Sequence, residues 1–324
     1  MKIAHLVLSN VYAGIEQHVN ELISEQHKEY EVILICNTEI EDKFDCPKIV
    51  SIKNFSRNSP FGLLKLFLLI KKINFDLIHT HGSKTSSIIN IIRKFINIKH
   101  VATAHGFKKK TTPFLKADKL ITVSSKIKSS IDRDSIIINN WWSPKLPQEI
   151  KRSNDYVLAV GRLEKVKGFD LLIKSWENIS SNLIIIGSGK EHSNLTKLID
   201  NLKLQSKVKI IDEISQIQLI EYYKKASMLI ISSRNEGGPR VALEALHLKI
   251  PVISTDVGHM SEILPKELLA KPNDLMSLKG LLETFINNPN YNQESIYQYV
   301  TEEFSLTSKS KQINNVYKDL LVSK

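Results

Sequence analysis

The chain has 324 residues, of which 42% are hydrophobic and 24% charged, a composition typical of a soluble globular protein of two domains. Its two cysteines, Cys36 and Cys46, exclude a disulfide-rich scaffold and favour a reducing compartment. Most of the net charge of +11 lies in residues 1–153, which hold 24 basic and 14 acidic side chains. An anionic partner is therefore expected for this half: a membrane surface, a phosphorylated acceptor or nucleic acid.

Apolar segments of strand length alternate with helical patterns along the first half of the chain. They are residues 2–8, 31–36, 76–81, 100–105, 119–124 and 136–139, separated by amphipathic stretches such as residues 15–26. Near-continuous apolar strands that alternate with helices predict a parallel sheet covered by helices on both faces. The opening segment, MKIAHLVLSN, has neither the length nor the cleavage site of a signal peptide, and we expect it to be the first strand.

The same alternation restarts after a linker-like segment at residues 143–155. Strand-like segments follow at residues 156–162, 182–189, 207–212, 227–233 and 251–256. A helical stripe is formed by Phe169, Leu172, Ile173 and Trp176, and the tail, residues 304–324, has a second helical pattern. Two such series predict an α/β fold of two facing, Rossmann-like, doubly wound domains, residues 1–150 and residues 151–305, with a ligand cleft between them.

Polar residues and glycines follow the carboxyl ends of many of these strands. They are Gly14, His81 and His105 in the first half, and Arg162, Gly187, Gly189 and Glu236 in the second. Ligands of doubly wound sheets bind beyond this end of the strands. The pattern therefore predicts a binding site with acidic, basic and glycine-rich walls.

The segment GRLEKVKG places Arg162 and Lys167 after one strand, with Gly168 at the start of a helix. An arginine, a lysine and helix N-terminal amides together suit a doubly charged diphosphate. The alternative is that both side chains are ordinary solvated charges on a loop.

The segment SSRNEGGPRVALEALHLKIPVIST places Glu236 and Glu244 on either side of a Gly-Gly-Pro turn. The glycines allow the backbone to approach a ligand closely, and Pro239 suits the first position of a helix. Glu244 would then lie within the helix, near enough to the cleft to bind a vicinal diol such as a ribose. The alternative is a loop acid followed by an acid on a helix surface.

Four segments carry a resemblance to a known family: ADKLITVSSKIK, AVGRLEKVKGFDLLIKSW, LIIIGSGKEHSNL and YYKKASMLIISSRNEGGPRVALEALHLKIPVISTDVG. They resemble the retaining glycosyltransferases of family 4 (glycosyl transferases group 1), which have the GT-B fold. The resemblance covers essentially the whole chain and is densest between residues 157 and 262.

The resemblance implies a role for each matching residue. Arg162, Lys167, Gly14 and Gly238 would bind the donor diphosphate, His105, Glu236 and Gly237 the donor sugar, and Glu244 the ribose, while Gly187, Ser188 and Ile214 would form a loop beside the base and phosphates. The catalytic set would be His105, Glu236, Arg162 and Lys167, with no metal and no other cofactor. The family also implies that the last helix, near residues 306–324, returns onto the first domain.

The chain departs from the family pattern at two places. The usual Gly-Gly pair is Ala13-Gly14 here, which keeps the glycine nearer the phosphates. The strand between the domains ends in INNWW rather than Asn-Gly, and Asn140 suits a left-handed turn in place of glycine. Packing at the hinge is the favoured role for Trp141 and Trp142, with sugar stacking as the alternative.

Several other polar patterns have ordinary explanations. His79 and His81 lie on the same side of a strand, but the sequence offers no evident third ligand, so no metal site is expected. Asp132 and Asp134 stand at the end of a predicted helix and are expected to be solvated. Two segments have two interpretations each. Residues 61–72 form either a core helix or an interfacial membrane helix. Lys108–Lys110 are either solvated or in contact with an anionic acceptor or lipid.

The expected function is transfer of a sugar, most simply from a UDP-hexose, to a hydroxyl of a glycan or glycolipid in bacterial surface polysaccharide or lipopolysaccharide biosynthesis. The alternatives are a nucleotide-sugar epimerase on the same fold and a non-catalytic protein that binds nucleic acid or another anion. No nucleic-acid partner is expected, because the basic residues show no aromatic interleaving. The expected location is the cytoplasm, with peripheral attachment to the inner face of the membrane through the basic first half.

Overall fold

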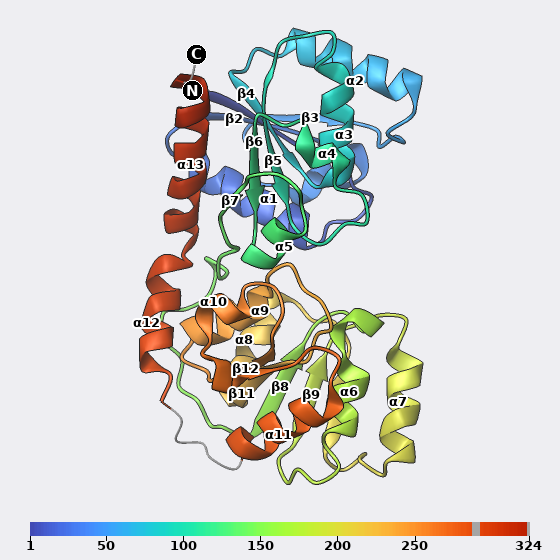
Figure 1. Cartoon of the computed structure of the whole chain (residues 1–324), viewed down its shortest axis with the longest axis vertical. Coiled ribbons are helices and arrows are strands. Elements are labelled where there is room, and N and C mark those ends of the chain that lie inside the picture. The colour runs from blue at the N-terminus through green and yellow to red at the C-terminus, as the bar shows by residue number, and fades with distance from the viewer. Residues whose placement is uncertain (287–291, 323–324) are drawn as a thin grey trace. The chain divides into compact units, whose positions relative to one another are not determined.

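The computed structural model describes residues 1–286 and 292–322 of the chain. The chain divides into two compact units (Figure 1). The N-terminal unit consists of Met1–Asn140 together with Leu306–Lys324, and the C-terminal unit is Trp141–Ser305. The sequence places the boundary after residue 150, whereas the N-terminal unit ends at Asn140, before the two tryptophans.

The N-terminal unit is built on a parallel sheet with the strand order β3-β2-β1-β4-β5-β6-β7. Its strands are β1 Lys2–Val7, β2 Glu31–Asn37, β3 Ile49–Ile52, β4 Leu77–His81, β5 Lys99–Ala104, β6 Lys119–Thr122 and β7 Ile136–Ile137. Its helices are α1 Gly14–Gln26, η1 Thr38–Lys43, α2 Pro60–Lys72, α3 Ser83–Ile92, α4 Thr112–Leu115, α5 Ser125–Ser129 and α13 Leu306–Val322.

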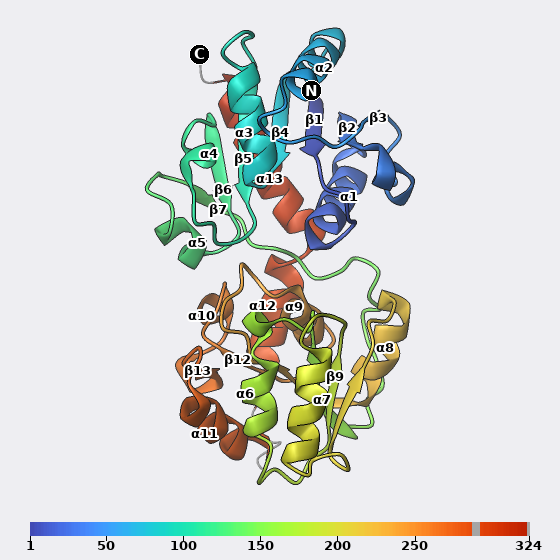
Figure 2. The ribbon, with the colours of Figure 1, turned by 90° about the vertical axis from the view of Figure 1, so that its right-hand side faces the viewer.

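Helices cover both faces of this sheet, as the apolar strands require. On one face, Leu6 of β1 packs in a cluster with Ile70 of α2 and Ile89 of α3. On the other face, Val7 packs with Ile23 of α1. Helix α13 lies on the same face as α1, since Asn314 accepts a hydrogen bond from the buried Gln26 side chain (2.7 Å) (Figures 1 and 2). The end of the chain thus completes the core of its first unit.

The C-terminal unit holds a second parallel sheet, with the order β10-β9-β8-β11-β12-β13. Its strands are β8 Tyr156–Val160, β9 Leu183–Ile186, β10 Val208–Ile211, β11 Ala226–Ile231, β12 Val252–Thr255 and β13 Leu269–Ala270. Its helices are η2 Lys165–Lys167, α6 Phe169–Lys174, α7 His192–Asn201, α8 Gln216–Lys225, α9 Arg240–His247, α10 Met260–Ile263, η3 Lys266–Leu268, α11 Leu275–Ile286 and α12 Glu294–Glu303. Figure 2 shows α6 and α7 on one face of the sheet and α9 and α12 on the other.

Side chains of the predicted helical stripe are buried in the core of the C-terminal unit. Of the two tryptophans at the unit boundary, Trp142 packs against this core. Trp141 is fully buried, and the ring of Trp142 stacks on His247 with 3.8 Å between the ring centroids. The Trp142 indole N–H donates to the carbonyl of Thr301 (3.3 Å), so this ring has protein partners on its face and its edge.

The sequence patterns miss two strands, β3 and β13, and both are edge strands. β3 is only half buried and β13 has two residues, so neither carries a long apolar run. The helix expected to end near Asp132 is the short α5, and it ends at Ser129. Asp134 is exposed, with an ion pair to Lys128 (3.4 Å), which agrees with a solvated surface.

Helix α2 has features of both a core helix and an interfacial membrane helix. Leu66 and Ile70 are buried against the sheet, as in a core helix. The outward side, however, bears Phe61, Leu64 and Leu68 at 85%, 55% and 57% exposure. No helix within residues 1–286 and 292–322 is long and apolar enough to cross a membrane.

Candidate functional site

Lys167 and Glu236 meet at the carboxyl ends of β8 and β11, although 69 residues separate them in the chain. Lys167 ends the short η2 turn, and its ammonium forms an ion pair with the Glu236 carboxylate. The same carboxylate accepts a hydrogen bond from the Ser233 hydroxyl (2.8 Å). Both charged side chains are mostly buried, at 18% and 15% exposure. A cation and a carboxylate thus lie in direct contact at the ends of these two strands.

Arg162 has a different environment on the same loop. Its side chain is 68% exposed, and its guanidinium donates to the Glu164 carboxylate at 2.7 Å. The pair is a surface contact that contributes little to stability. The guanidinium is therefore accessible to an anionic ligand.

Close backbone approach joins this loop to the end of β11. Gly168 has φ +66°, and a Cβ there would lie 2.1 Å from the carbonyl oxygen of Ser232. The Ser232 hydroxyl in turn donates to the carbonyl of Lys167 (2.9 Å). Only glycine allows both the left-handed conformation and this approach. Gly168 thus sets where the Lys167 ammonium can reach.

Arg234, which follows β11, is hydrogen-bonded to the segment that follows β8. The sequence analysis did not identify this residue. Its guanidinium binds both carboxylate oxygens of Asp170 at 2.7 Å and also donates to the carbonyl of Lys165 at 2.6 Å. Burial raises the pKa of Asp170, but the bidentate Arg234 outweighs it and the net shift is downward. A fork of this geometry fixes orientation as well as charge. The 64 residues between the partners hid the pair from any local pattern.

The Gly-Gly turn lies between Glu236 and α9. A Cβ at Gly258, in the loop after β12, would lie 3.0 Å from the carbonyl oxygen of Gly237 and from the backbone of Gly238, so that loop backs the turn closely. The expectation that Pro239 begins the helix is wrong by one residue, because α9 starts at Arg240 and Pro239 is its N-cap.

Glu244 lies in α9 and is 5% exposed. Its carboxylate accepts hydrogen bonds from two side chains of α8: the Tyr223 hydroxyl at 3.0 Å and the Gln216 amide at 3.2 Å. Burial and the nearby carboxylate raise the pKa of Tyr223 well above its usual value, so the phenol remains a donor. Glu244 is therefore a held carboxylate and not the helix-surface acid of the alternative interpretation.

Gly187, Ser188 and Ile214 lie around the ends of β8, β9 and β10. A Cβ at Gly187 would meet the carbonyl oxygen of Gly161 at 1.9 Å, which brings the ends of β8 and β9 together. The Ser188 hydroxyl accepts from the backbone N–H of Glu213 (3.0 Å), next to the partly buried Ile214. The three residues thus belong to one connected group of loops.

The N-terminal unit holds the other predicted residues, Gly14 and His105. Gly14 is the first residue of α1, and a Cβ there would meet nothing within 4 Å. His105 follows β5, with its Nε2 at 3.2 Å from Nδ1 of His81 and its ring edge-on to His18 of α1, 4.6 Å between centroids. Burial, helped by the nearby Lys108, lowers the pKa of His105 to about 3, so its ring is neutral at physiological pH.

The comparisons with known proteins agree across both units. The model of glycosyltransferase family 4 matches residues 12–137, and that of the glycosyl transferases group 1 matches residues 145–301. An uncharacterised glycosyltransferase of Methanocaldococcus jannaschii is 28% identical over 300 residues, 85% of this chain and 81% of its own. A putative teichuronic acid biosynthesis glycosyltransferase of Bacillus subtilis, TuaC, is 25% identical over 75% of this chain and 70% of its own.

A solved structure has the same fold. Anabaena HepE, crystallised in complex with UDP and glucose, superposes with a TM-score of 0.83 over 98% of this chain and 100% of its own, at 17% identity. The prediction of an α/β fold with two Rossmann-like domains is therefore confirmed. With glycosyltransferase family models matched in both units and the same two-domain architecture, this chain is a glycosyltransferase with the GT-B fold.

Proposed function

We propose that the enzyme transfers a hexose from a UDP-hexose donor to a hydroxyl group of a glycan or lipid-linked acceptor, with retention at the anomeric carbon. The observation that supports this best is the meeting of Lys167 and Glu236 at the strand ends, beside the Gly237-Gly238 backbone. A cation and a carboxylate in one place suit a ligand that combines a diphosphate with a polyhydroxylated sugar. HepE, with the same fold, was crystallised with UDP and glucose.

In this proposal the diphosphate competes with Glu236 for the Lys167 ammonium. Cleavage of the bond between the sugar and the phosphate builds negative charge on the leaving group. Lys167 and the exposed Arg162 stabilise that charge, which requires neither a metal nor another cofactor. Glu236, released from part of its ion pair, is then available to accept from a sugar hydroxyl beside Gly237.

Glu244 anchors the ribose. A carboxylate has about four lone-pair sites on two oxygens. Tyr223 and Gln216 hold one oxygen each, which fixes the orientation of the carboxylate proposed to accept from the hydroxyls of a diol. Gly187, Ser188 and Ile214 lie beside the base and phosphates, and Gly14, at the start of α1, contributes a backbone N–H to the phosphates.

The proposed reaction takes place on one face of the sugar. The acceptor oxygen forms a bond to the anomeric carbon on the face from which the diphosphate leaves, and the leaving phosphate oxygen takes the proton of the acceptor hydroxyl. No protein base or nucleophile is needed in this scheme. His105 and Glu236 orient the sugar.

The acceptor is proposed to be anchored at an anionic membrane surface, in polysaccharide or lipopolysaccharide biosynthesis. The outward side of α2 carries the exposed Phe61, Leu64 and Leu68, and Lys65, Lys71 and Lys72 are exposed on the same helix. An apolar stripe with flanking lysines suits the headgroup region of anionic phospholipid. TuaC, named for teichuronic acid biosynthesis, is consistent with a polymer as the product.

The donor part of this proposal is tested by thermal shift. UDP-, GDP-, ADP- and CMP-sugars are added separately to the wild type and to Glu244→Ala. A ligand at roughly 100 times its dissociation constant adds about 2.7 kcal/mol of stability. We expect UDP-hexoses to stabilise the wild type, and the variant to lose that stabilisation.

The control variant is Glu221→Ala, which removes an exposed carboxylate from α8 and should respond like the wild type. Equal stabilisation of Glu244→Ala would contradict the ribose role. Conversion of the donor sugar into an isomer without any acceptor would point to an epimerase instead.

A further inference from the structure

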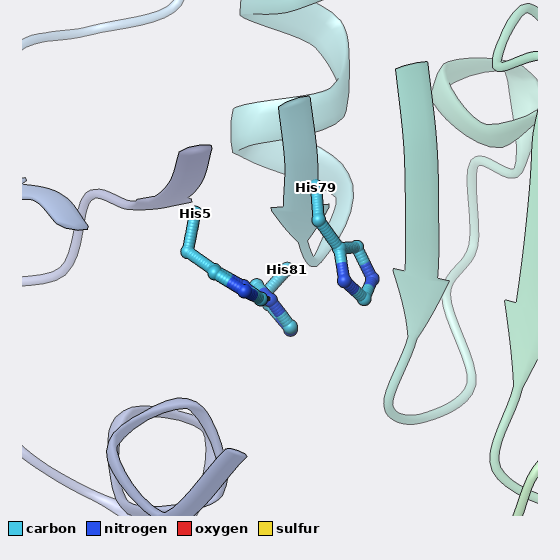
Figure 3. A group of neighbouring side chains, drawn as sticks. All are labelled: His5, His79 and His81. Carbon is cyan, nitrogen blue, oxygen red and sulfur yellow. Dashed lines mark hydrogen bonds between the residues drawn. The ribbon is translucent and has the colours of Figure 1, made fainter. Parts of the chain in front are cut away.

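A chain of buried histidines crosses the N-terminal sheet on the face of α1 and α13. His5 of β1 and His79 of β4 are register partners, and His81 is two residues further along the same face of β4 (Figure 3). Their exposures are 0%, 0% and 5%. Burial lowers the pKa of His5 to about 4 and that of His81 well below its usual value, so the rings are neutral.

Hydrogen bonds join this cluster to His105 at one end and to the helices at the other. His105 Nε2 lies 3.2 Å from His81 Nδ1, and His81 Nε2 lies 3.1 Å from His5 Nδ1. His5 Nε2 lies 2.8 Å from the side-chain oxygen of Gln26 in α1. The Gln26 amide nitrogen donates to Asn314 of α13 at 2.7 Å.

This series has only one consistent direction when the rings are neutral. A neutral imidazole has one N–H and one lone pair. The oxygen of Gln26 accepts, so His5 must carry its proton on Nε2, and its Nδ1 must accept from His81 Nε2–H. His81 Nδ1 is then a lone pair, which accepts from His105 Nε2–H. The remaining nitrogen of His105, Nδ1, is left as a lone pair.

The geometry points to Gln26, His5 and His81 as positioning residues that hold His105 in its Nε2–H tautomer, with Nδ1 presented to the donor sugar as a hydrogen-bond acceptor. The inference rests on the proposed function for the contact of His105 with the sugar, but the tautomer itself does not. It deepens the specificity of the site: the sugar must bring a hydroxyl donor to Nδ1, and a donor deoxygenated at that position would bind less well.

A metal ion is the competing explanation for such a cluster. Ligand atoms of His5, His79 and His81 lie within 4.8 Å of one another. Both nitrogens of His79, however, already have partners, the Tyr317 hydroxyl at 2.5 Å and the Thr103 hydroxyl at 2.7 Å. His5 is likewise engaged at both nitrogens. Hydrogen bonds account for these rings, and a metal would have to displace several of them.

The decisive variant is Gln26→Glu, which lies at the far end of the chain of bonds from His105. A carboxylate beside His5 favours the doubly protonated ring. His5 would then donate from Nδ1 to His81, His81 would donate from Nδ1 to His105, and His105 would carry its proton on Nδ1. The variant thus reverses the tautomer of His105 without touching it. The matched control is His100→Gln. It removes a buried histidine that is hydrogen-bonded to Thr80 and takes no part in the series of bonds from Gln26 to His105.

The experiment is ring-nitrogen NMR of the full-length protein with histidines labelled in nitrogen-15, combined with donor kinetics. Wild type and His100→Gln should show His105 protonated at Nε2, and Gln26→Glu should show it protonated at Nδ1. For a UDP-hexose, kcat/KM of Gln26→Glu should fall by roughly tenfold or more, about the loss of one hydrogen bond.

Three results would overturn the inference in distinguishable ways. A wild-type His105 protonated at Nδ1, or one unmoved by Gln26→Glu, defeats the positioning role itself. A reversed tautomer with unchanged kcat/KM defeats the contact between His105 and the sugar, and with it that part of the proposed function. Stoichiometric zinc in the purified protein, with deprotonated nitrogens on both His5 and His81, replaces the hydrogen-bonded chain with a metal site.

Discussion

At the scale of single residues, the loop after β8 carries one mostly buried cation and one exposed cation. Lys167 is mostly buried against Glu236, whereas Arg162 is mostly exposed. In the proposed reaction Lys167 is held at the strand ends and exchanges part of its ion pair with Glu236 for the diphosphate, while Arg162 must leave Glu164 to reach it. Electrostatic groups that are already in place contribute most to lowering a barrier.

Alanine substitution tests these two cations. We expect Arg162→Ala and Lys167→Ala each to lower turnover by at least about tenfold, which corresponds to about 1.4 kcal/mol of transition-state stabilisation. Lys167→Ala should be the more damaging, because it also leaves the Glu236 carboxylate without its ion pair. Steady-state rates with the identified donor measure the effect.

Lys165→Ala is the control for that series, since it removes an exposed cation from the same η2 turn. It should keep the wild-type rate. Wild-type rates in both Arg162→Ala and Lys167→Ala would refute the role in charge stabilisation, and full loss of activity in EDTA would refute the proposal that no metal is needed.

At the scale of elements, the sequence predicts secondary structure well where strands are central and long. β1, β4 and β8 follow from their apolar runs, whereas the edge strands β3 and β13 are too short or too exposed to stand out. Contacts between elements are harder to predict, because they depend on which strands become neighbours. His79 and His81 were recognised on one face of a strand, but only the pairing of β1 with β4 adds His5 to them.

In the candidate site, likewise, single residues were predictable from the sequence and the contacts between them were not. Lys167 and Glu236 were each predicted for the donor, yet no spacing indicates that they form an ion pair. The Arg234–Asp170 fork was missed because both residues look like surface charges in the sequence. Glu244 was expected near a cleft, and its burial against Tyr223 depends on how α8 packs beside α9.

Helix α2 gives the prediction that belongs to this scale. The double variant Leu64→Glu/Leu68→Glu replaces two exposed leucines and adds negative charge beside an anionic surface. Each leucine that enters the membrane interface contributes up to about 2 kcal/mol. We therefore expect flotation with phosphatidylglycerol liposomes to fall by at least roughly tenfold.

Ile217→Glu provides the control, since Ile217 is 78% exposed on α8 of the C-terminal unit. It should float like the wild type. Flotation of the α2 double variant at the wild-type level, or equal binding of the wild type to neutral liposomes, would rule out α2 as an anionic membrane contact.

At the scale of the whole molecule, the N-terminal unit buries several neutral histidines, and this makes its stability depend on pH. Burial lowers the pKa of His100 to about 3, as it lowers that of His5 to about 4, and the same cause acts on His79 and His81. These rings are neutral in the folded state but take up protons near pH 6.5 in the unfolded state. Their contribution to stability is complete above pH 6.5 and is lost as the pH falls toward 4.

We therefore expect urea unfolding of the N-terminal unit to shift to lower urea between pH 7 and pH 5. His5 alone, with its pKa near 4, accounts for about 2 kcal/mol at pH 5. His100→Gln should reduce the dependence on pH, because it removes one of the buried rings. His27→Gln, at an exposed position, should leave it unchanged. A midpoint that stays constant from pH 7 to pH 5 would contradict buried neutral histidines.

The place of α13 has a consequence for how the protein is made. The N-terminal unit begins the chain, but its histidine face receives Asn314 and Tyr317 from the last helix. A ribosome adds about 5–20 residues per second, so at least about twelve seconds separate the synthesis of His79 from that of its partner Tyr317. The C-terminal unit, Trp141–Ser305, is fully synthesised before that partner exists. The N-terminal unit is therefore translated first, but its core is complete only when the last helix has been synthesised.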